Sequence, residues 1–569
     1  MSGLKDIREN AEFDVVIMGA GINGAGLFRE LALQDLRVLL VDRSDICSGA
    51  SCAPSRLIHG GIKYLETGEF RLVAQSTLER NLLLRNAPHV VKPLPTVLPI
   101  RSWFGGIVPS VRKFLRLGGK MTDRGALVLE AGLQIYDFLG RRARVMPRHS
   151  LFLNRRTREE WPHMATDVLA TAQYYDAAIT QPERLGYECV QDGLNVGTGC
   201  GVATYTVPVS FADGILRLRD SMTGETRNVR ARALVNAGGA WIDRINAVLG
   251  ETTRYIGGTK GSHLLLRHDG LLRELKGRMM YFGTPDGRIC LAYPFYGHVL
   301  VGSTDIRIED PDTATCTDDE QDYMLRMVAD LFPGFSFNPD DVVYRYSGVR
   351  PLPATDASDP GAISRDHIVH ENRLGDTPLL SLVGGKWTTF RGLAEEVADR
   401  LLETLGAPRH LSTKTFPIGG GRDYPAPERY SAYLDEFFVT YGMPRQRAGI
   451  LLERYGSRAR AFAVFCQKEA DAPLRTLPTY TRRELAFIAS EELVRTLSDV
   501  LFRRTPIALS GLLTPDVVLE VGGIIGAALG WSAQETDRQC RAAWKEAQER
   551  HNLKGDLPDT SLSQTALRA

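Results

Sequence analysis

The chain of 569 residues lacks the run of about 18 apolar residues that a membrane-spanning helix requires. Residues 1–13 are polar and charged and contain no apolar core of a signal peptide. We therefore expect a cytoplasmic protein whose contact with the inner face of the cell membrane, if there is one, is peripheral. An excess of one charge is also missing, because 69 basic and 68 acidic residues leave a formal net charge of +1. Nucleic-acid-binding proteins usually carry a basic excess, so no nucleic-acid partner is expected.

The sequence also lacks closely spaced cysteines of the kind that bind metals. None of the eight cysteines forms a C-x-x-C pair, and none is spaced with histidine as in a zinc site. The sequence therefore predicts free thiols in a reducing compartment and no bound metal. Hydrophobic residues make up 43% and charged residues 24% of the chain, as in globular proteins. Its length exceeds that of one ordinary domain, so at least two are expected.

A strand, a glycine turn and a helix follow one another near the start of the chain. Residues 13–19 form an apolar run typical of a buried parallel strand, and residues 25–33 have helical spacing. The glycines of a G-x-G-x-x-G turn between them are Gly19, Gly21 and Gly24. In this context they favour a tight turn, close approach to a pyrophosphate and close packing of helix on strand. The helix N-terminus adds N–H groups for the phosphates.

An acidic residue ends the next predicted strand, which covers residues 37–41. Asp42 at that position predicts a contact with ribose hydroxyls and argues against the extra phosphate of NADP. The motif alone does not separate NAD from FAD, but small residues recur after the apolar runs 233–235 and 380–383. Such returns resemble two-dinucleotide-binding flavoproteins, in which small residues let the backbone approach the cofactor again. We therefore expect FAD.

The spread of these three passes predicts an α/β fold in which the cofactor domain is interleaved with a second lobe. A Rossmann-like FAD-binding domain is expected from segments at about 11–90, 197–260 and 346–407. Residues 288–295 and 298–303, with turn residues beside them, predict strands of an antiparallel substrate lobe.

Composition changes near residue 408, and residues 408–569 are expected to form a helical C-terminal domain without cofactor motifs. Helical spacing is clear over 483–501. Arg503 and Arg504 are expected to pair with acidic residues inside that domain.

Three longer motifs carry a family resemblance: S-R-L-I-H-G-G-I-K-Y-L-E at 55–66, S-G-V-R-P-L at 347–352 and V-G-G-K-W-T-T-F at 383–390. Together they resemble the FAD-dependent glycerol-3-phosphate dehydrogenases, within the glycine-oxidase and D-amino-acid-oxidase-like flavoproteins. Further similar segments lie at 260–263, 302–305, 363–366 and 497–509. The resemblance implies oxidation of sn-glycerol 3-phosphate to dihydroxyacetone phosphate, with hydride transfer from C2 to flavin N5. The electrons would then pass to a membrane quinone, or to oxygen in the oxidase branch. A homodimer is left open.

Residues in the matching motifs are candidates for the site. A phosphate requires several cations and donors, and the candidates are Lys63, Tyr64, Arg350, Arg365, Lys386 and Thr388. The hydroxyl proton requires a base, for which arginine is too basic. We favour His59 as this base, and His263 is the alternative. The resemblance also implies that Arg350 lies over the flavin and has a catalytic role. The residues expected to contact FAD are Gly19, Gly21, Gly24, Asp42, Arg43, Ser51, Ser55, Gly60, Gly61, Val202, Ala237, Gly238, Gly239, Trp241, Gly384, Gly385, Lys386, Trp387 and Thr388.

Two departures from the family pattern keep other functions open. Lys63 stands where the family commonly has arginine, and a lysine offers phosphate a point charge rather than a fork. Segment 100–161 is longer than in typical members. Dehydrogenation of another polyol phosphate, such as erythritol phosphate, and an oxygen-using glycerophosphate oxidase are therefore alternatives. An amine or amino-acid oxidase and a non-catalytic FAD-binding or RNA-modification protein are less favoured.

A basic segment within this longer region has two interpretations. Residues 101–120 mix aromatic and aliphatic residues with five cations and no acid. A segment of this kind either lies on a bilayer surface or packs on the enzyme's own core with a solvated basic face.

Overall fold

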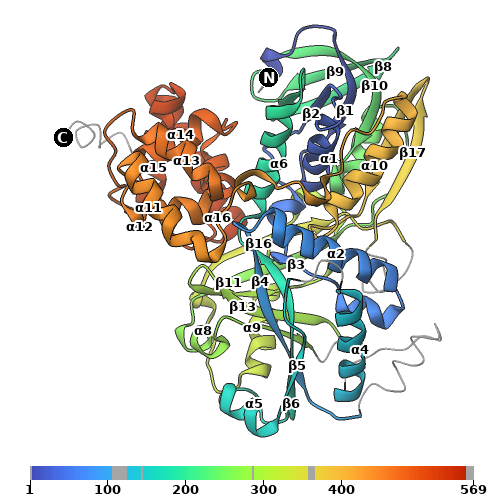
Figure 1. Ribbon diagram of the computed structural model, residues 1–569. Coiled ribbons are helices and arrows are strands. Elements are labelled where there is room, and N and C mark those ends of the chain that lie inside the picture. The colour runs from blue at the N-terminus through green and yellow to red at the C-terminus, as the bar shows by residue number, and fades with distance from the viewer. Residues whose placement is uncertain (1–2, 105–124, 142–144, 285–286, 356–365, 559–569) are drawn as a thin grey trace.

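The computed structural model describes residues 3–104, 125–141, 145–284, 287–355 and 366–558. Figure 1 shows three bodies: an upper α/β lobe, a lower lobe built on a second sheet, and a group of helices beside both. The upper lobe is assembled from segments distant in sequence, because the chain leaves it twice to build the lower lobe. The predicted interleaved α/β fold with a helical C-terminal domain is confirmed.

The upper lobe, which we call the Rossmann-like lobe, contains an eight-stranded sheet within the described residues. Its central strands run in parallel in the order β18-β10-β1-β2-β7, and antiparallel β17 adds to one edge. Strands β8 and β9 extend from β10 as an antiparallel arm. The strands are β1 (Ala11–Met18), β2 (Val38–Val41), β7 (Gly201–Ala203), β8 (Thr206–Ala212), β9 (Ile215–Asp220), β10 (Thr226–Asn236), β17 (Ile368–Leu374) and β18 (Thr377–Val383).

Both faces of this sheet are covered. Along β1, Val15 and Ile17 pack in one hydrophobic cluster, while Val16 and Met18 pack in another on the opposite face. A continuous apolar run is what a parallel strand buried on both sides requires. The helices are α1 (Ile22–Ala32), α6 (Pro182–Val196), α7 (Ile242–Val248) and α10 (Phe390–Leu405). Of these, α1 lies between α6 and α10 on the first face.

The lower lobe, called here the sheet lobe, has a ten-stranded sheet within the described residues. Its neighbouring strands are antiparallel, with one parallel pair, β4 and β12. The strands are β3 (Leu57–Ile58), β4 (Val91–Ile100), β5 (Ser150–Leu153), β6 (Ala170–Ile179), β11 (Thr259–Leu266), β12 (Met279–Gly283), β13 (Ile289–Phe295), β14 (His298–Gly302), β15 (Ile306–Arg307) and β16 (Val342–Arg350). The predicted strand pair is present as β13 and β14, joined by a turn in which Tyr296 and Gly297 both have positive φ.

Helices cover the sheet lobe on several sides. They are α2 (Phe70–Asn86), α4 (Ala126–Leu139), α5 (Asn154–Glu160), α8 (Asp269–Leu275) and α9 (Asp318–Leu331). No helix in the described ranges is both long and apolar enough to span a bilayer.

The C-terminal domain consists of α11 (Tyr430–Tyr441), α12 (Arg445–Tyr455), α13 (Ala459–Cys466), α14 (Arg482–Glu491), α15 (Pro515–Leu529) and α16 (Ala533–His551), with a π-helical turn at Asp499–Arg504. The helical spacing over 483–501 is realised in part, since α14 ends at Glu491 and the π-helical turn begins at Asp499. Leu493 has φ of +55°, which ends a right-handed helix, and Glu492 binds the buried Arg184 of α6 at 2.6 Å.

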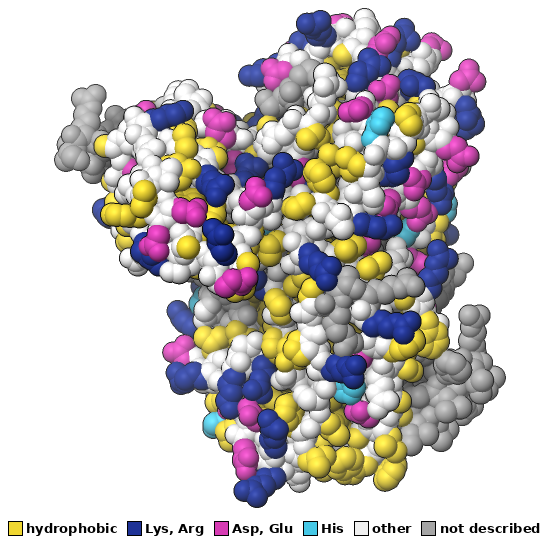
Figure 2. All heavy atoms as spheres, in the orientation of Figure 1, with side chains coloured by type: hydrophobic (Ala, Val, Ile, Leu, Met, Phe, Trp, Pro, Cys, Tyr) yellow, Lys and Arg dark blue, Asp and Glu magenta, His cyan; other side chains and the backbone are white. Residues whose placement is uncertain are grey.

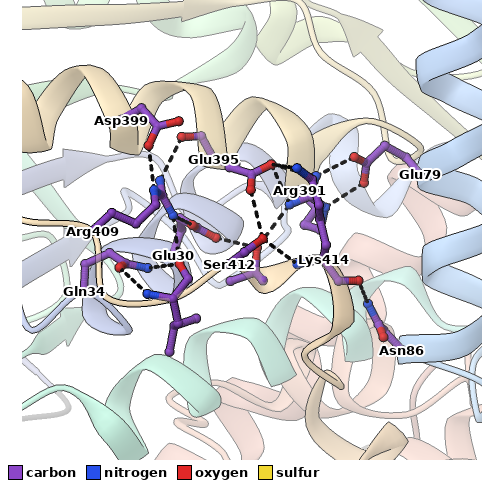
Figure 3. A network of polar contacts seen from close by, with 12 residues as sticks. Glu30, Gln34, Glu79, Asn86, Arg391, Glu395, Asp399, Arg409, Ser412 and Lys414 are labelled. Carbon is purple, nitrogen blue, oxygen red and sulfur yellow. Dashed lines mark hydrogen bonds and ion pairs between the residues drawn. The ribbon is translucent and has the colours of Figure 1, made fainter.

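The segment that leaves α10 stays attached to the Rossmann-like lobe. Figure 3 shows it beside α1, α2 and α10, with Arg409 between Glu30 and Asp399. The backbone N–H groups of residues 410 and 411 donate to Gln34, and Thr413 donates to Glu30 at 2.6 Å. The domain boundary at residue 408 remains a proposal, and the first residues beyond it are held by the lobe before it.

Arg503 and Arg504 pair with acidic residues as expected, but one of these partners, Asp45, lies outside the C-terminal domain. Arg504 binds Asp45 of the Rossmann-like lobe with both terminal nitrogens at 2.8 Å. Arg503 binds Asp499 inside the C-terminal domain at 2.8 Å, but it also binds Asp45 at 2.6 Å. Asp45 lies more than 450 residues earlier in the chain, so only the tertiary structure brings the three charges together.

Candidate active site

A cavity of about 1840 Å³ opens at the carboxyl ends of β1, β2, β10 and β18. Ligands of open α/β sheets bind at such strand ends. The cavity is larger than the roughly 300–1,000 Å³ typical of a small-molecule pocket, so it has room for a dinucleotide and a second ligand. Walls from the Rossmann-like lobe, the sheet lobe and the C-terminal domain surround it.

The turn after β1 leaves space only for glycine. Gly19 has φ of +111°, and a Cβ atom there would lie 2.5 Å from the carbonyl oxygen of Ala237. A Cβ atom on Gly24 would lie 1.8 Å from the carbonyl oxygen of Gly19. The turn, α1 and the small residues after β10 are therefore in direct backbone contact. This arrangement fits a close-packed dinucleotide cradle at the N-terminus of α1.

Asp42 lies beside this turn at the end of β2. Its carboxylate accepts hydrogen bonds from the N–H groups of Ala20 at 2.6 Å and Ser44 at 2.8 Å. Burial outweighs these hydrogen bonds and raises the pKa of Asp42 to about 6. When a nucleotide binds, a ribose hydroxyl could donate a further hydrogen bond to this carboxylate.

The segment after β18 reaches the same cavity. Gly384 and Gly385 have φ of +79° and +85°, and Asn23 of α1 donates to the carbonyl of Gly384 at 3.1 Å. The Oδ1 atom of Asn23 is buried and has no hydrogen-bond partner within the described chain. The indole of Trp387 donates to the carbonyl of Ser51 at 3.1 Å. Thus the first and third predicted passes of the chain meet at one place.

Most of the predicted cofactor residues line the cavity. Those that do are Gly19, Gly21, Asp42, Arg43, Ser51, Ser55, Gly61, Ala237, Gly238, Gly239, Trp241, Gly384, Gly385, Lys386, Trp387 and Thr388. Gly24, Gly60 and Val202 lie behind its wall. Arg43 also stacks over Trp241 at 4.3 Å and binds Asp312 of the sheet lobe.

Three of the four predicted phosphate-binding cations, Lys63, Lys386 and Arg350, line the cavity. The ammonium of Lys386 lies 4.0 Å from the ring centroid of Tyr64. Arg350, at the end of β16, donates to Asp305 and to Ser303 Oγ, each at 3.1 Å. The fourth predicted cation, Arg365, lies outside the described residues, as does most of segment 101–120.

Both candidate histidines lie at the cavity wall, where His263 is buried and His59 is partly exposed. Burial, with smaller contributions from Lys386 and Arg80, lowers the pKa of His59 to about 4. Burial and the charge of Arg350 lower the pKa of His263 well below its ordinary value. His263 Nε2 lies 2.8 Å from Ser55 Oγ, and its ring stacks on Tyr346. Both imidazoles are therefore uncharged at neutral pH.

Sequence patterns missed the side chains that hold the His59 turn. The N–H group of Gly60 donates to Asp176 at 2.9 Å, and Tyr136 donates to the same oxygen at 2.6 Å. Arg80 binds both partners, at 2.9 Å and 2.7 Å. In the sequence Tyr136 follows ordinary helical spacing and Asp176 sits in a strand, so neither stands out. Asp305 could have been noticed, because it ends the 302–305 segment.

Comparisons with known proteins agree with this geometry. Residues 14–399 match the family described as FAD dependent oxidoreductase, and residues 411–536 match the C-terminal domain of alpha-glycerophosphate oxidase. A glycerol-3-phosphate dehydrogenase of Synechocystis sp. is 30% identical over 563 residues, which covers 93% of this chain and 95% of that protein. A D-erythritol 1-phosphate dehydrogenase of Brucella abortus is 30% identical and covers 86% of this chain and 94% of its own length.

A solved structure shows the same fold. The glycerol-3-phosphate dehydrogenase from Bacillus halodurans, in complex with FAD, superposes with a TM-score of 0.72 at 22% identity and covers 95% of both chains. The bare glycine cradle, the Asn23 oxygen without a hydrogen-bond partner in the described chain and the partly buried Asp42 carboxylate all fit a dinucleotide. The chain therefore belongs to the FAD dependent oxidoreductase family, as a member of its glycerol-3-phosphate dehydrogenase group, and its cofactor is FAD.

Proposed function

We propose that this enzyme oxidises sn-glycerol 3-phosphate at C2 to dihydroxyacetone phosphate. The observation that carries the proposal is the presence of Lys63, Arg350 and Lys386 around one cavity that also contains the dinucleotide cradle. A phosphorylated substrate requires such a group of cations, whereas a simple amino acid does not. Relatives named glycerol-3-phosphate dehydrogenase support the same substrate.

In this proposal the chain's residues divide into two groups. The turn 19–24 binds the pyrophosphate, Asp42 binds the ribose, and residues 384–388 face the flavin. Arg350 and Lys386, with Tyr64 and Lys63, bind the phosphate or the hydroxyl groups of the substrate. Bound FAD supplies the oxidant, a hydride acceptor at N5. The residues of the chain orient the C2–H bond and remove the hydroxyl proton, for which His59 is our first candidate and His263 the second.

The substrate is tested by anaerobic reduction of the bound flavin with a panel of phosphorylated polyols. We expect glycerol 3-phosphate to bleach the flavin fastest. Erythritol 1-phosphate is a second candidate, because Lys63 departs from the family arginine and a relative with that activity is 30% identical. Fastest bleaching by erythritol phosphate would replace the first proposal, and bleaching by glycine alone would contradict both.

Asp42 gives a prediction for cofactor affinity. Its pKa of about 6 in the flavin-free enzyme means that a carboxylate ready to accept from ribose is present only above that pH. We expect the affinity for FAD to rise as the pH increases from 5 to 7, and Asp42→Asn to remove this rise. The measurement is fluorescence titration of the flavin-free full-length enzyme with FAD. Asp14→Asn is the control, because Arg37 pairs with Asp14 away from the cavity. An unchanged pH slope in Asp42→Asn would contradict the assignment.

The same carboxylate has a consequence for the stability of the flavin-free enzyme. The folded-state pKa is raised above 3.8, so the stabilisation that Asp42 contributes is complete below that pH and is lost as the pH rises through about 6. A rise of about two pKa units corresponds to about 3 kcal/mol. Between pH 4 and pH 7.5 the free energy of unfolding of Asp42→Asn should therefore gain about that amount relative to wild type. Chemical denaturation at both pH values measures it.

We also propose that electrons pass to a membrane quinone and that one end of the sheet lobe contacts the bilayer. Large apolar side chains are exposed on this lobe from the end of β4 along the length of α4, and they include Phe104, Leu127, Ile135 and Phe138. Figure 2 shows further hydrophobic side chains gathered at the lower end of the molecule. An exposed apolar patch of this kind supports contact with a lipid surface.

Binding to anionic vesicles tests this surface. Phe104 is 72% and Phe138 is 58% exposed, so Phe104→Ser with Phe138→Ser should weaken cosedimentation about tenfold without slowing flavin reduction. Phe438→Ser is the matched control, because that side chain is also 58% exposed but lies on α11. Equal losses in both variants would contradict the proposed surface. Faster reoxidation by oxygen than by a soluble quinone would favour the oxidase alternative.

A further inference from the structure

Two loops of the Rossmann-like lobe border the cavity beside Asp42. One follows β2, and the other is the turn between β7 and β8. Their backbones are joined, because Asp42 N–H donates to Ala203 O at 3.1 Å and Thr206 N–H donates to Asp42 O at 2.6 Å. Tyr205 N–H donates to Ser44 O at 3.1 Å. A shift of either loop would therefore move the Asp42 carboxylate.

The C-terminal domain contacts both loops through one network of buried charges, called here the Asp45 network. Asp45, in the first loop, binds Arg504 and Arg503. Arg503 also binds Asp499 at 2.8 Å, and Asp499 accepts from the hydroxyl of Tyr205, in the second loop, at 2.6 Å. Asp45, Asp499 and Arg504 are almost wholly buried, and Tyr205 and Arg503 line the cavity. The network thus runs from one loop to the other through the C-terminal domain.

The local backbone makes this network possible. Arg503 and Arg504 are consecutive, yet both reach Asp45, because they end the π-helical turn Asp499–Arg504. π-Helical turns are rare in proteins, and those that do occur are often found at functional sites. Two arginines and two aspartates balance in charge, and Arg504 also donates to the carbonyl of Glu492 at 2.9 Å. Removing one member of such a network leaves a buried charge without its partner, so the loops that carry Asp45 and Tyr205 would have to rearrange.

We propose that Arg503, Arg504 and Asp499 are positioning residues for the adenosine half of FAD. The C-terminal domain, which carries no dinucleotide motif, thereby controls how tightly the cofactor is held. This inference rests on the proposed role of Asp42 as the ribose ligand and not on the identity of the substrate. It predicts that loss of the network weakens binding of FAD but not of FMN, which has no adenosine.

The test uses the full-length enzyme with Arg504→Met, and with Arg504→Lys as a milder variant that keeps the charge but not the fork. We expect FAD to leave Arg504→Met about tenfold faster, measured by the fluorescence of released flavin on dilution. The affinity of the flavin-free enzyme for FMN should stay within about twofold of wild type. Glu484→Gln is the matched control, because Glu484 is also fully buried in the C-terminal domain but pairs with Arg447 and Arg454 of α12 rather than with the Asp45 network.

The outcomes separate positioning from a general loss of structure. Unchanged FAD release, equal losses for FAD and FMN, or an equal effect in Glu484→Gln would overturn the proposal. If Arg504→Met does not fold, FAD release and FMN affinity are measured in Arg504→Lys instead, and the same outcomes decide the proposal. None of these measurements uses the substrate, so a failure of the proposed oxidation would leave the result readable.

Discussion

The Arg350→Ala enzyme is expected to remain yellow while glycerol 3-phosphate reduces its flavin about 10³-fold more slowly than in wild type. The guanidinium lines the cavity at the end of β16, held by Asp305 and by the hydroxyl of Ser303. Gly261, on the facing strand β11, leaves room for it, since a Cβ atom there would lie 2.2 Å from the Arg350 side chain. A guanidinium held in this way, with its terminal nitrogens on Asp305, Ser303 and the carbonyl of Thr304, places a fixed positive charge at the cavity for an anionic substrate. Truncating it would leave the substrate charge without its partner.

Anaerobic stopped-flow reduction measures this effect, and the visible spectrum reports retention of FAD. Arg350→Lys should recover only part of the rate, because lysine lacks the planar fork. Arg345→Ala is the matched control: Arg345 lies on the same strand but binds Asp318 outside the cavity. Reduction of Arg350→Ala at the wild-type rate would show that the substrate site lies elsewhere. Loss of FAD from the variant would show instead that Arg350 supports the cofactor.

The His59→Asn enzyme should reduce its flavin about 10²-fold more slowly, as expected for loss of a proton acceptor. His59 lies in the turn held by Asp176 and Tyr136, and its backbone N–H donates to Thr388 Oγ1 at 3.1 Å. Its backbone therefore touches the segment proposed to face the flavin. Since burial lowers its pKa to about 4, the imidazole is the free base throughout the neutral range. At saturating substrate, where ionisation of the free substrate phosphate no longer affects the rate, wild-type flavin reduction should then stay level from pH 6 to pH 8 and fall only near pH 4.

The comparison with His263→Asn decides between the two histidines. His263 is held by Ser55 and Tyr346 and lies next to Arg350, so its loss should disturb substrate orientation and cost about tenfold in rate. The Asp176→Asn variant adds a check. It weakens the hydrogen bonds that hold the His59 turn but does not remove the imidazole itself. A larger loss in His263→Asn than in His59→Asn would reverse the assignment. A wild-type inflection between pH 6 and pH 7 would show that a different group removes the proton.

Much of the cofactor domain could be predicted because its information is local. Residues 13–42 specify a strand, a turn, a helix and a second strand within one short stretch, and the steric demands at Gly19 and Gly24 act over a few residues. The prediction of β13 and β14 succeeded for the same reason, since the turn residues lie between the strands. The helical spacing over 483–501 is realised only in α14 and in the π-helical turn, because the backbone of Leu493 between them has φ of +55°.

The sequence by itself determined the class of fold, the dinucleotide cradle and the set of cations that a phosphorylated substrate requires, because short motifs encode turns and charges directly. Only the tertiary structure decided which of those residues share one cavity. It also decided that Asp176 and Tyr136 hold the His59 turn, and that Arg504 of the C-terminal domain pairs with Asp45 of the Rossmann-like lobe. The physical reason is that buried polar groups must find partners, and the nearest partner in space is set by packing of distant segments rather than by sequence separation.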